Sequence, residues 1–220
     1  LRVCRVSGAP QIQTGQGVIA AAWVLLAYAL GSLPTAYWMG RALRGIDIRT
    51  VGSGNVGATN VFRSVGRGAG IATLVIDMVK GWLPVFLCLR WGPGGLVPVA
   101  VGVTAVLGHG WSPWVGFRGG KGVATSAGVF IALLPGPMLF AFLAFAIGFG
   151  LSRRVSVGSL LAAVALPSAA VWRGAPAAER NLALLLGSFV IFKHLPNIRR
   201  LMRGEEPPVR FGNTDNRAAS

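Results

Sequence analysis

Apolar stretches recur along most of this chain, and they limit its possible folds more than any other feature of the sequence. A helix that spans a membrane needs about 20 apolar residues, and helices inside a bundle can be shorter. The stretches predict about seven membrane helices, several of them short or broken next to irregular backbone. They comprise residues 18–40, 68–90, 96–107, 123–134, 138–151, 155–172 and 181–192.

The composition supports a membrane protein. Apolar residues make up 53% of the 220 residues and charged residues only 12%, with a mean hydropathy of +0.62. A soluble domain averages about 25% charged residues, and one of this size cannot bury so much apolar surface. We therefore predict an all-α, polytopic membrane helix bundle, and we exclude a soluble globule, a disordered chain and a secreted disulfide scaffold.

The chain divides into three segments by polarity. Residues 1–17 form a polar N-terminal extension, residues 18–206 a single integral-membrane domain with the candidate catalytic residues, and residues 207–220 a polar tail. We expect the tail to be flexible. No cleavage signature follows the first apolar stretch, so we interpret it as a retained helix and not as a signal peptide.

The charge is strongly basic and unevenly placed. Lys and Arg number 21 against 6 acidic residues, a formal net charge of +15. Most of the basic residues fall in loops that alternating helices place on one side, which the positive-inside rule assigns to the cytoplasm. This predicts a cytoplasmic C-terminus and an external N-terminus. The excess charge implies an anionic partner, either lipid headgroups or phosphorylated small molecules, and the hydropathy argues against nucleic acid.

Three loops on the predicted cytoplasmic side combine glycine with basic residues, at 52–70, 108–125 and 192–206. In the first loop, glycines allow backbone N–H groups to turn toward an anion. Arg63 offers a two-pronged guanidinium for a phosphate. The other candidate ligands of this loop are Ser53, Gly54, Asn55, Gly57, Thr59 and Asn60.

The other two loops suit the same chemistry. Gly119 and Gly120 precede Lys121 near the start of a predicted helix, where the helix dipole also favours an anion. His194 and Asn197 are three residues apart, a spacing that places both on one face of a helix. Together the loops predict a phosphate site. Taken singly, each residue also fits a structural role: glycine in close helix packing, Arg or Lys in topology, and His in packing.

Several chemistries are excluded by spacing. Gly52, Gly54 and Gly57 fit a dinucleotide fingerprint, but no strand precedes them. Residues 116–121 resemble a Walker loop, but Gly122 occupies the position of the magnesium-binding hydroxyl. Close carboxylate pairs and metal-ligand clusters are missing from the sequence, so we expect no metal and no cofactor. Catalysis should then rely on positioning and charge stabilisation.

The three loops together resemble one family, the bacterial acyl-phosphate-dependent glycerol-3-phosphate acyltransferases (PlsY). Residues 53–63 match its motif SGNxGATNxxR, and residues 108–125 match its motif GHxFPxFxxFKGGKGVAT with Trp111 for Phe and one extra residue before Pro113. The third motif, HRxNIxRLxxGxE, is matched by His194, Asn197, Ile198, Arg200, Leu201, Gly204 and Glu206. It departs at Leu195, which replaces Arg, and at Pro196; Lys193 is a candidate to supply the missing charge.

The resemblance implies transfer of a fatty acyl group from acyl phosphate to the sn-1 hydroxyl of glycerol 3-phosphate, the first step of bacterial phospholipid synthesis. The products are lysophosphatidic acid and phosphate, and no covalent acyl-enzyme forms. It implies a monomer with no obligate protein partner, surrounded by lipids of the bacterial inner membrane, with a cytoplasmic active site. Implied ligands of glycerol 3-phosphate are Ser53, Arg63, Lys121, His194 and Asn197, of which Ser53, His194 and Asn197 are the candidate catalytic residues. Implied ligands of acyl phosphate are Gly54, Asn55, Gly57, Thr59, Asn60, Gly119 and Gly120; Asp77, Lys80, His109 and Glu206 support the site.

Two other functions remain as alternatives. A membrane transporter for a phosphorylated or anionic solute would use similar glycine-broken helices, but it should show internal repeats, and none is evident. A membrane phosphatase or alcohol phosphotransferase would need a His/Ser/Arg set or an acidic metal cluster.

Overall fold

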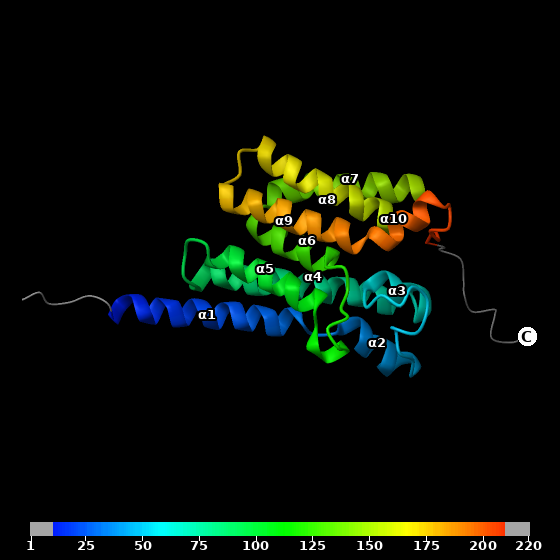
Figure 1. Ribbon diagram of the computed structural model, residues 1–220, viewed down its shortest axis with the longest axis horizontal. Helices are drawn as coiled ribbons and strands as arrows, with labels where there is room; N and C mark the ends of the chain where they lie inside the picture. Colours follow the sequence, from blue (N-terminus) through cyan, green and yellow to red (C-terminus); the bar gives the residue numbers. More distant parts are fainter. Residues whose placement is uncertain (1–10, 210–220) are drawn as a thin grey trace, which may run out of the picture.

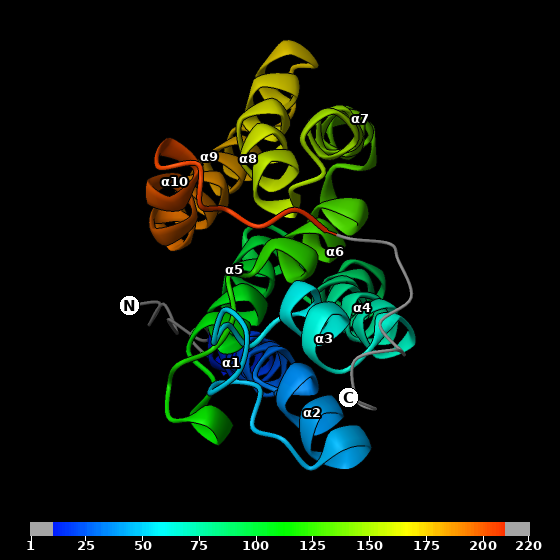
Figure 2. The same cartoon turned by 90° about the vertical axis from the view of Figure 1, so that its right-hand side faces the viewer.

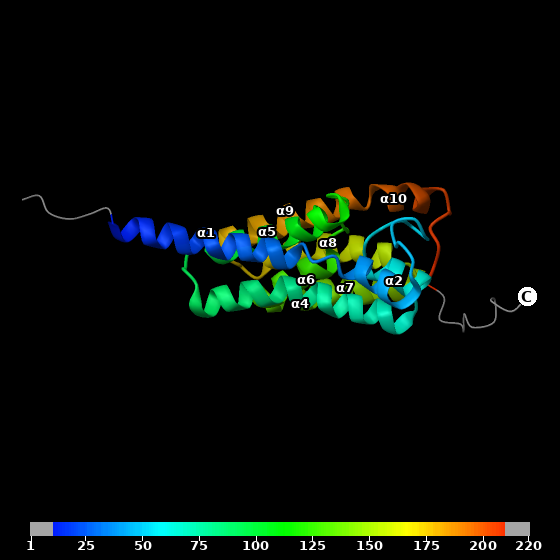
Figure 3. The ribbon, with the colours of Figure 1, turned by 90° about the horizontal axis from the view of Figure 1, so that it is seen from below.

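The protein is a helix bundle. The computed structural model describes residues 11–209, and in that range all regular secondary structure is helical, as predicted. The longer helices run roughly parallel to the long axis (Figures 1 and 3). They are α1 (Gln11–Gly31), α4 (Arg67–Trp91), α5 (Val97–Gly110), α6 (Val123–Leu133), α7 (Pro135–Ser152), α8 (Val155–Trp172) and α9 (Ala177–Lys193). Shorter elements are α2 (Thr35–Arg44), α3 (Ala58–Ser64), the 3-10 turn η1 (Pro113–Val115) and α10 (Leu195–Met202).

Length and hydropathy identify fewer membrane spans than the sequence suggested. Within the described range, 4 segments are long and apolar enough to cross a membrane: Gly15–Arg44, α4, α7 and α8. The pair α9 and α10, bent by 54°, makes up to 5. Each of the predicted apolar stretches is helical, but α6 has only 11 residues. At 1.5 Å per residue it covers roughly half of a 30 Å hydrocarbon core. The predicted number of seven spans is therefore not confirmed.

The first apolar stretch is broken, although it was predicted as one helix over residues 18–40. α1 ends at Gly31 and α2 begins at Thr35, with Pro34 between them. Proline lacks a backbone N–H and pushes the preceding residue out of helical conformation, which ends α1. At its other end α1 begins at Gln11, so residues 11–17 continue the helix; residues 1–10 of the predicted extension lie outside the described range.

Close helix contacts depend on glycine. A Cβ on Gly81 of α4 would collide with the Thr125 carbonyl of α6, and one on Gly128 of α6 would collide with the Met78 carbonyl of α4. The two backbones can therefore approach more closely than larger residues would allow. This contact holds α6, which opens directly after the second glycine-rich loop, against the long helix α4.

The helices form two groups seen end-on in Figure 2, with α1, α2, α3, α4 and α5 in one and α7, α8, α9 and α10 in the other. The short helices α2, α3 and α10 lie at the same end of the bundle (Figure 1). The polar loops that flank them are thus brought to one end, which places the site.

Candidate active site

A cavity of about 810 Å³ lies at this end of the bundle and is lined by residues of all three predicted loops. Twelve of the predicted site residues contribute to its wall: Ser53, Asn55, Gly57, Thr59, Asn60, Arg63, Asp77, His109, Lys121, His194, Asn197 and Glu206. The predicted residues Gly54, Gly119, Gly120 and Lys80 are not in this wall. One continuous space therefore joins motifs that are far apart in the sequence.

A hydrogen-bond network centred on Glu206 holds the third motif against Lys121. Lys121 Nζ donates to Asn197 Oδ1, and Asn197 Nδ2 donates to Glu206 Oε1 at 2.6 Å. Glu206 Oε1 also accepts from Ser156 Oγ at 2.8 Å, and its Oε2 accepts from Arg200 Nε at 2.7 Å. With only 5% of Glu206 exposed, the carboxylate orients Asn197 so that the amide oxygen faces Lys121.

Two members of this hydrogen-bond network, Arg200 and Ser156, were not predicted as site residues from the sequence. Arg200 follows Asn197 by one helical turn within the third motif, so the helical spacing could have suggested it. Ser156 stands in the apolar stretch that becomes α8, and nothing in its sequence neighbourhood distinguishes it. Its role follows only from the packing of α8 beside the C-terminal residues.

The cavity concentrates positive charge where water is partly excluded. Burial, together with the nearby Arg200 and Arg63, lowers the pKa of Lys121 to about 8, against the opposing effect of Glu206. Burial also lowers the pKa of Arg63. Burial raises the pKa of Glu206, but hydrogen bonds from Asn197, Arg200 and Ser156 outweigh this effect and lower its pKa overall. An anionic ligand would relieve the crowding of Lys121, Arg63 and Arg200.

The first loop is organised around Asn60, which is only 2% exposed. Its Nδ2 donates to the carbonyls of Ile48 and Val51 at 2.9 and 3.1 Å, and its Oδ1 accepts from the N–H of Ser53 at 3.1 Å. The amide of Asn60 is thus used within its own loop. Gly54 has φ +67°, a left-handed conformation that favours glycine and lets the loop turn back.

Gly119 and Gly120 pack against the end of α5. The N–H of Gly120 donates to the His109 carbonyl at 3.1 Å. A Cβ on Gly120 would collide with the His109 ring and the Val56 carbonyl. These glycines therefore let the second loop pass between α5 and the first loop, and Lys121 and Gly122 reach the cavity wall immediately after them.

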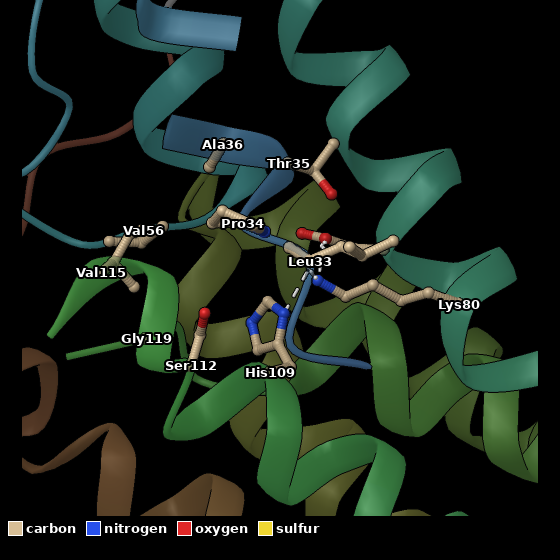
Figure 4. Close-up of a pocket in the computed structure, with 11 residues that line it drawn as sticks. Leu33, Pro34, Thr35, Ala36, Val56, Lys80, His109, Ser112, Val115 and Gly119 are labelled. Carbon is tan, nitrogen blue, oxygen red and sulfur yellow. Dashed lines mark hydrogen bonds and ion pairs between the residues drawn. The ribbon is translucent and has the colours of Figure 1, made fainter. Parts of the chain in front are cut away.

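A buried ion pair lines a second, small pocket between α2, α4 and α5 (Figure 4). Asp77 Oδ1 and Lys80 Nζ of α4 are 2.8 Å apart, and His109 Nδ1 of α5 is 3.8 Å from the same carboxylate oxygen. Lys80 Nζ also donates to the Leu33 carbonyl at 2.8 Å, beside the break made by Pro34. A lysine at this point satisfies a carbonyl that a continuous helix would have paired. Asp77 and His109 line both this small pocket and the large cavity.

Residues 21–204 match a family model described as glycerol-3-phosphate acyltransferase. The match covers most of the chain and includes the first two loops and the third as far as residue 204. The chain belongs to this family.

Similar proteins carry the same name. The glycerol-3-phosphate acyltransferase of Synechococcus sp. (strain JA-3-3Ab) is 46% identical over 183 residues, covering 83% of this chain and 89% of the relative. That of Endomicrobium trichonymphae is 40% identical over 189 residues, covering 86% and 95%. The crystal structure of PlsY, an integral membrane glycerol 3-phosphate acyltransferase, in its glycerol 3-phosphate form has a TM-score of 0.80 at 36% identity, covering 87% of this chain and 96% of that one. The lysophosphatidic acid form of the same protein has a TM-score of 0.79. The protein is thus a multi-pass membrane acyltransferase.

The departure from the third family motif is not compensated inside the cavity. Leu195 is 41% exposed. Lys193 Nζ lies 4.7 Å from the centre of the Trp111 ring, a cation–π contact. Neither Leu195 nor Lys193 contributes to the cavity wall. The role of Lys193 as a replacement for the missing arginine stays a prediction, with its ammonium held at Trp111 and outside the cavity wall.

Metal ligation was not expected. Within residues 11–209, no group of three or more His, Cys, Asp or Glu side chains is arranged to hold a metal ion.

Proposed function

We propose that this acyltransferase moves a fatty acyl group from acyl phosphate to the sn-1 hydroxyl of glycerol 3-phosphate. The products are 1-acyl-glycerol 3-phosphate (lysophosphatidic acid) and inorganic phosphate. The observation that supports this most is the meeting of Arg63, Lys121, His194 and Asn197 on one cavity wall. Two cations suit a phosphate, and a neighbouring imidazole and amide suit a hydroxyl.

The acceptor side uses Ser53, Arg63 and Lys121 for the phosphate of glycerol 3-phosphate. His194 and Asn197 hold the glycerol part and the reacting centre. His194 Nδ1 lies 2.8 Å from the Val190 carbonyl. Because a carbonyl can only accept, Nδ1 carries the proton and Nε2 of the neutral ring is left as an acceptor for the substrate hydroxyl.

The donor side uses the first loop for the acyl phosphate. Asn55, Gly57 and Thr59 line the cavity and are better placed for this than Asn60, whose amide is used inside the loop, or Gly54, Gly119 and Gly120. Apolar side chains of α4 and α7 line another part of the wall and suit the acyl chain: Ile71, Leu74, Phe145 and Phe149. The donor headgroup and its chain thus face chemically matched surfaces.

The chemistry balances without a separate base. The sn-1 oxygen attacks the acyl carbon, the bond from that carbon to the phosphate oxygen breaks, and the hydroxyl proton leaves with the phosphate. Acyl phosphate is already activated, so the protein chiefly positions two anions that repel each other. Arg63 and Lys121 offset this repulsion in a partly desolvated site, where charge interactions are stronger than in water.

The proposal also covers the cellular location, the oligomeric state and the orientation in the membrane. We place the enzyme in the bacterial inner membrane as a monomer surrounded by lipid, with its N-terminus outside. The cavity end and the C-terminus face the cytoplasm, because the basic loops gather there.

The test is to measure the stoichiometry of the reaction that the purified protein catalyses in detergent. We expect phosphate release from palmitoyl phosphate only when glycerol 3-phosphate is added, with one lysophosphatidic acid formed for each phosphate. Ester formation from palmitoyl-CoA in place of palmitoyl phosphate would show that the donor is wrong.

A further inference from the structure

The chain crosses the end of the bundle after α10, beyond the residues that match the family model. We call residues 205–209 the strap; it runs from α10 across this end in Figure 2. Glu205, Glu206, Pro207 and Val209 all line the cavity. The polar tail predicted to be flexible from residue 207 therefore begins as an ordered part of the cavity wall, while residues 210–220 lie outside the described range.

The strap is fastened to the turn between α7 and α8. Arg154 Nε donates to the Glu206 carbonyl at 2.7 Å. The N–H of Val209 donates to the Arg153 carbonyl, also at 2.7 Å. The side chain of Val209 is buried, with 5% exposed. Two hydrogen bonds to the strap backbone and one apolar anchor thus hold the strap against the turn between α7 and α8.

The strap also touches the proposed phosphate ligand. Arg63 Nη2 of α3 donates to the Pro207 carbonyl at 2.8 Å. A guanidinium has five N–H donors, so this contact leaves others for a phosphate and orients the group. The consecutive residues Pro207 and Pro208 restrict the backbone to extended conformations. The strap is therefore a stiff segment held by the α7–α8 turn at Glu206 and at Val209, with Arg63 in contact with Pro207 between these two points.

We infer that the strap is the outer wall of the acceptor subsite and limits the acceptor to a short phosphorylated alcohol. This inference rests on the proposed function. Arg63 binds the phosphate end of the acceptor and donates to Pro207 of the strap. Asn197 holds the glycerol part and donates to Glu206 of the strap, so the strap runs beside the acceptor along its length. A longer polyol held by the same phosphate contacts would have to displace the strap from Arg154 and Arg153.

Two strap variants and one matched control test this wall. Arg154→Ala removes the side-chain attachment to the Glu206 carbonyl, and Val209→Asp removes the apolar anchor; neither changes a proposed substrate ligand. Arg153→Gly is the control, because it removes a cation from the same turn but keeps the carbonyl that accepts from Val209. Arg153 has φ +54°, a conformation that glycine adopts readily.

The measurement is the ratio of kcat/KM for glycerol 3-phosphate to that for sorbitol 6-phosphate, with palmitoyl phosphate as donor. We expect the wild-type protein and Arg153→Gly to prefer glycerol 3-phosphate equally. In each strap variant the ratio should fall about tenfold, through a gain on the longer acceptor. This is the effect expected for losing one charge-assisted contact in Arg154→Ala, or one buried apolar side chain in Val209→Asp. An unchanged ratio in both strap variants, or no preference in the wild-type protein, would overturn the inference. Absence of any acyl ester from wild-type protein with either acceptor would instead contradict the proposed acyl transfer.

Discussion

At the scale of single residues, Lys121 is the most informative group. Burial and two neighbouring arginines hold its pKa at about 8, so its charge is lost at a pH where an exposed lysine is still fully protonated. The ammonium is present below this pKa and disappears as the pH rises through it. Binding of an anionic acceptor should weaken in the same direction.

We therefore predict that kcat/KM for glycerol 3-phosphate falls above about pH 8 in the wild-type protein, since the neutral amine no longer attracts the phosphate. The measurement is a pH profile with uncatalysed donor hydrolysis subtracted. Lys121→Arg is the control, because a guanidinium stays charged to above pH 12. Its falling limb should move to higher pH. If the falling limbs of the two pH profiles coincide, a group other than Lys121 is responsible for the decrease.

Other residues differ from what the motifs alone suggested. Asn60 matches the first motif, and sequence comparison cannot tell whether its amide faces a ligand or the loop. The structure gives its hydrogen bonds to the carbonyls of Ile48 and Val51. Ser156 had no motif at all, and its contact with Glu206 depends on a neighbour 50 positions along the chain.

At the scale of elements, α4 carries a charged pair inside an apolar bundle. Asp77 and Lys80 are one helical turn apart and both are buried, with side-chain exposures of 3% and 5%. The hydrogen bond that Lys80 donates to the Leu33 carbonyl ties α4 to the point where α1 ends. The pair therefore holds the broken first helix against the helix that forms one side of the cavity.

Asp77→Asn should lower the free energy of unfolding by about 3–5 kcal/mol, because it leaves the Lys80 ammonium buried without a counter-charge. Thermal unfolding in detergent measures the effect. The double variant Asp77→Leu/Lys80→Met should regain much of the loss, since it removes both charges together.

The matched control is a pair near the surface. Asp47 contacts Arg49, whose side chain is 39% exposed, at 2.7 Å. Asp47→Asn should cost about 1 kcal/mol or less, as exposed ion pairs do. Equal losses for Asp47→Asn and Asp77→Asn would contradict a structural role for the α4 pair.

At the scale of the whole molecule, the turns at the two ends of the bundle should face different compartments. The turn after α7 lies at the cavity end and the turn after α8 at the opposite end (Figure 1). The proposed orientation places the first in the cytoplasm and the second outside.

In a Cys4→Ser background, we expect a membrane-impermeant maleimide to label Arg173→Cys in intact cells, because the turn after α8 is external. Arg153→Cys should be labelled only after the membrane is permeabilised. Cys88 is the internal control, since it is 1% exposed and should stay unlabelled in both. The reverse pattern of labelling would invert the orientation.

By itself, the sequence determined the helical membrane class and the three polar clusters, because hydropathy and motif spacing are local properties of the chain. It also identified Arg63, Lys121, His194 and Asn197 as candidates. The break at Pro34 was also a local property, since proline ends a helix in any surroundings. The use of Glu206 to orient Asn197 and the strap over Arg63 were decided only by the tertiary structure. Each of these depends on which helices pack together, and the energy of such packing is shared among residues far apart in the chain. No local pattern of residues records it.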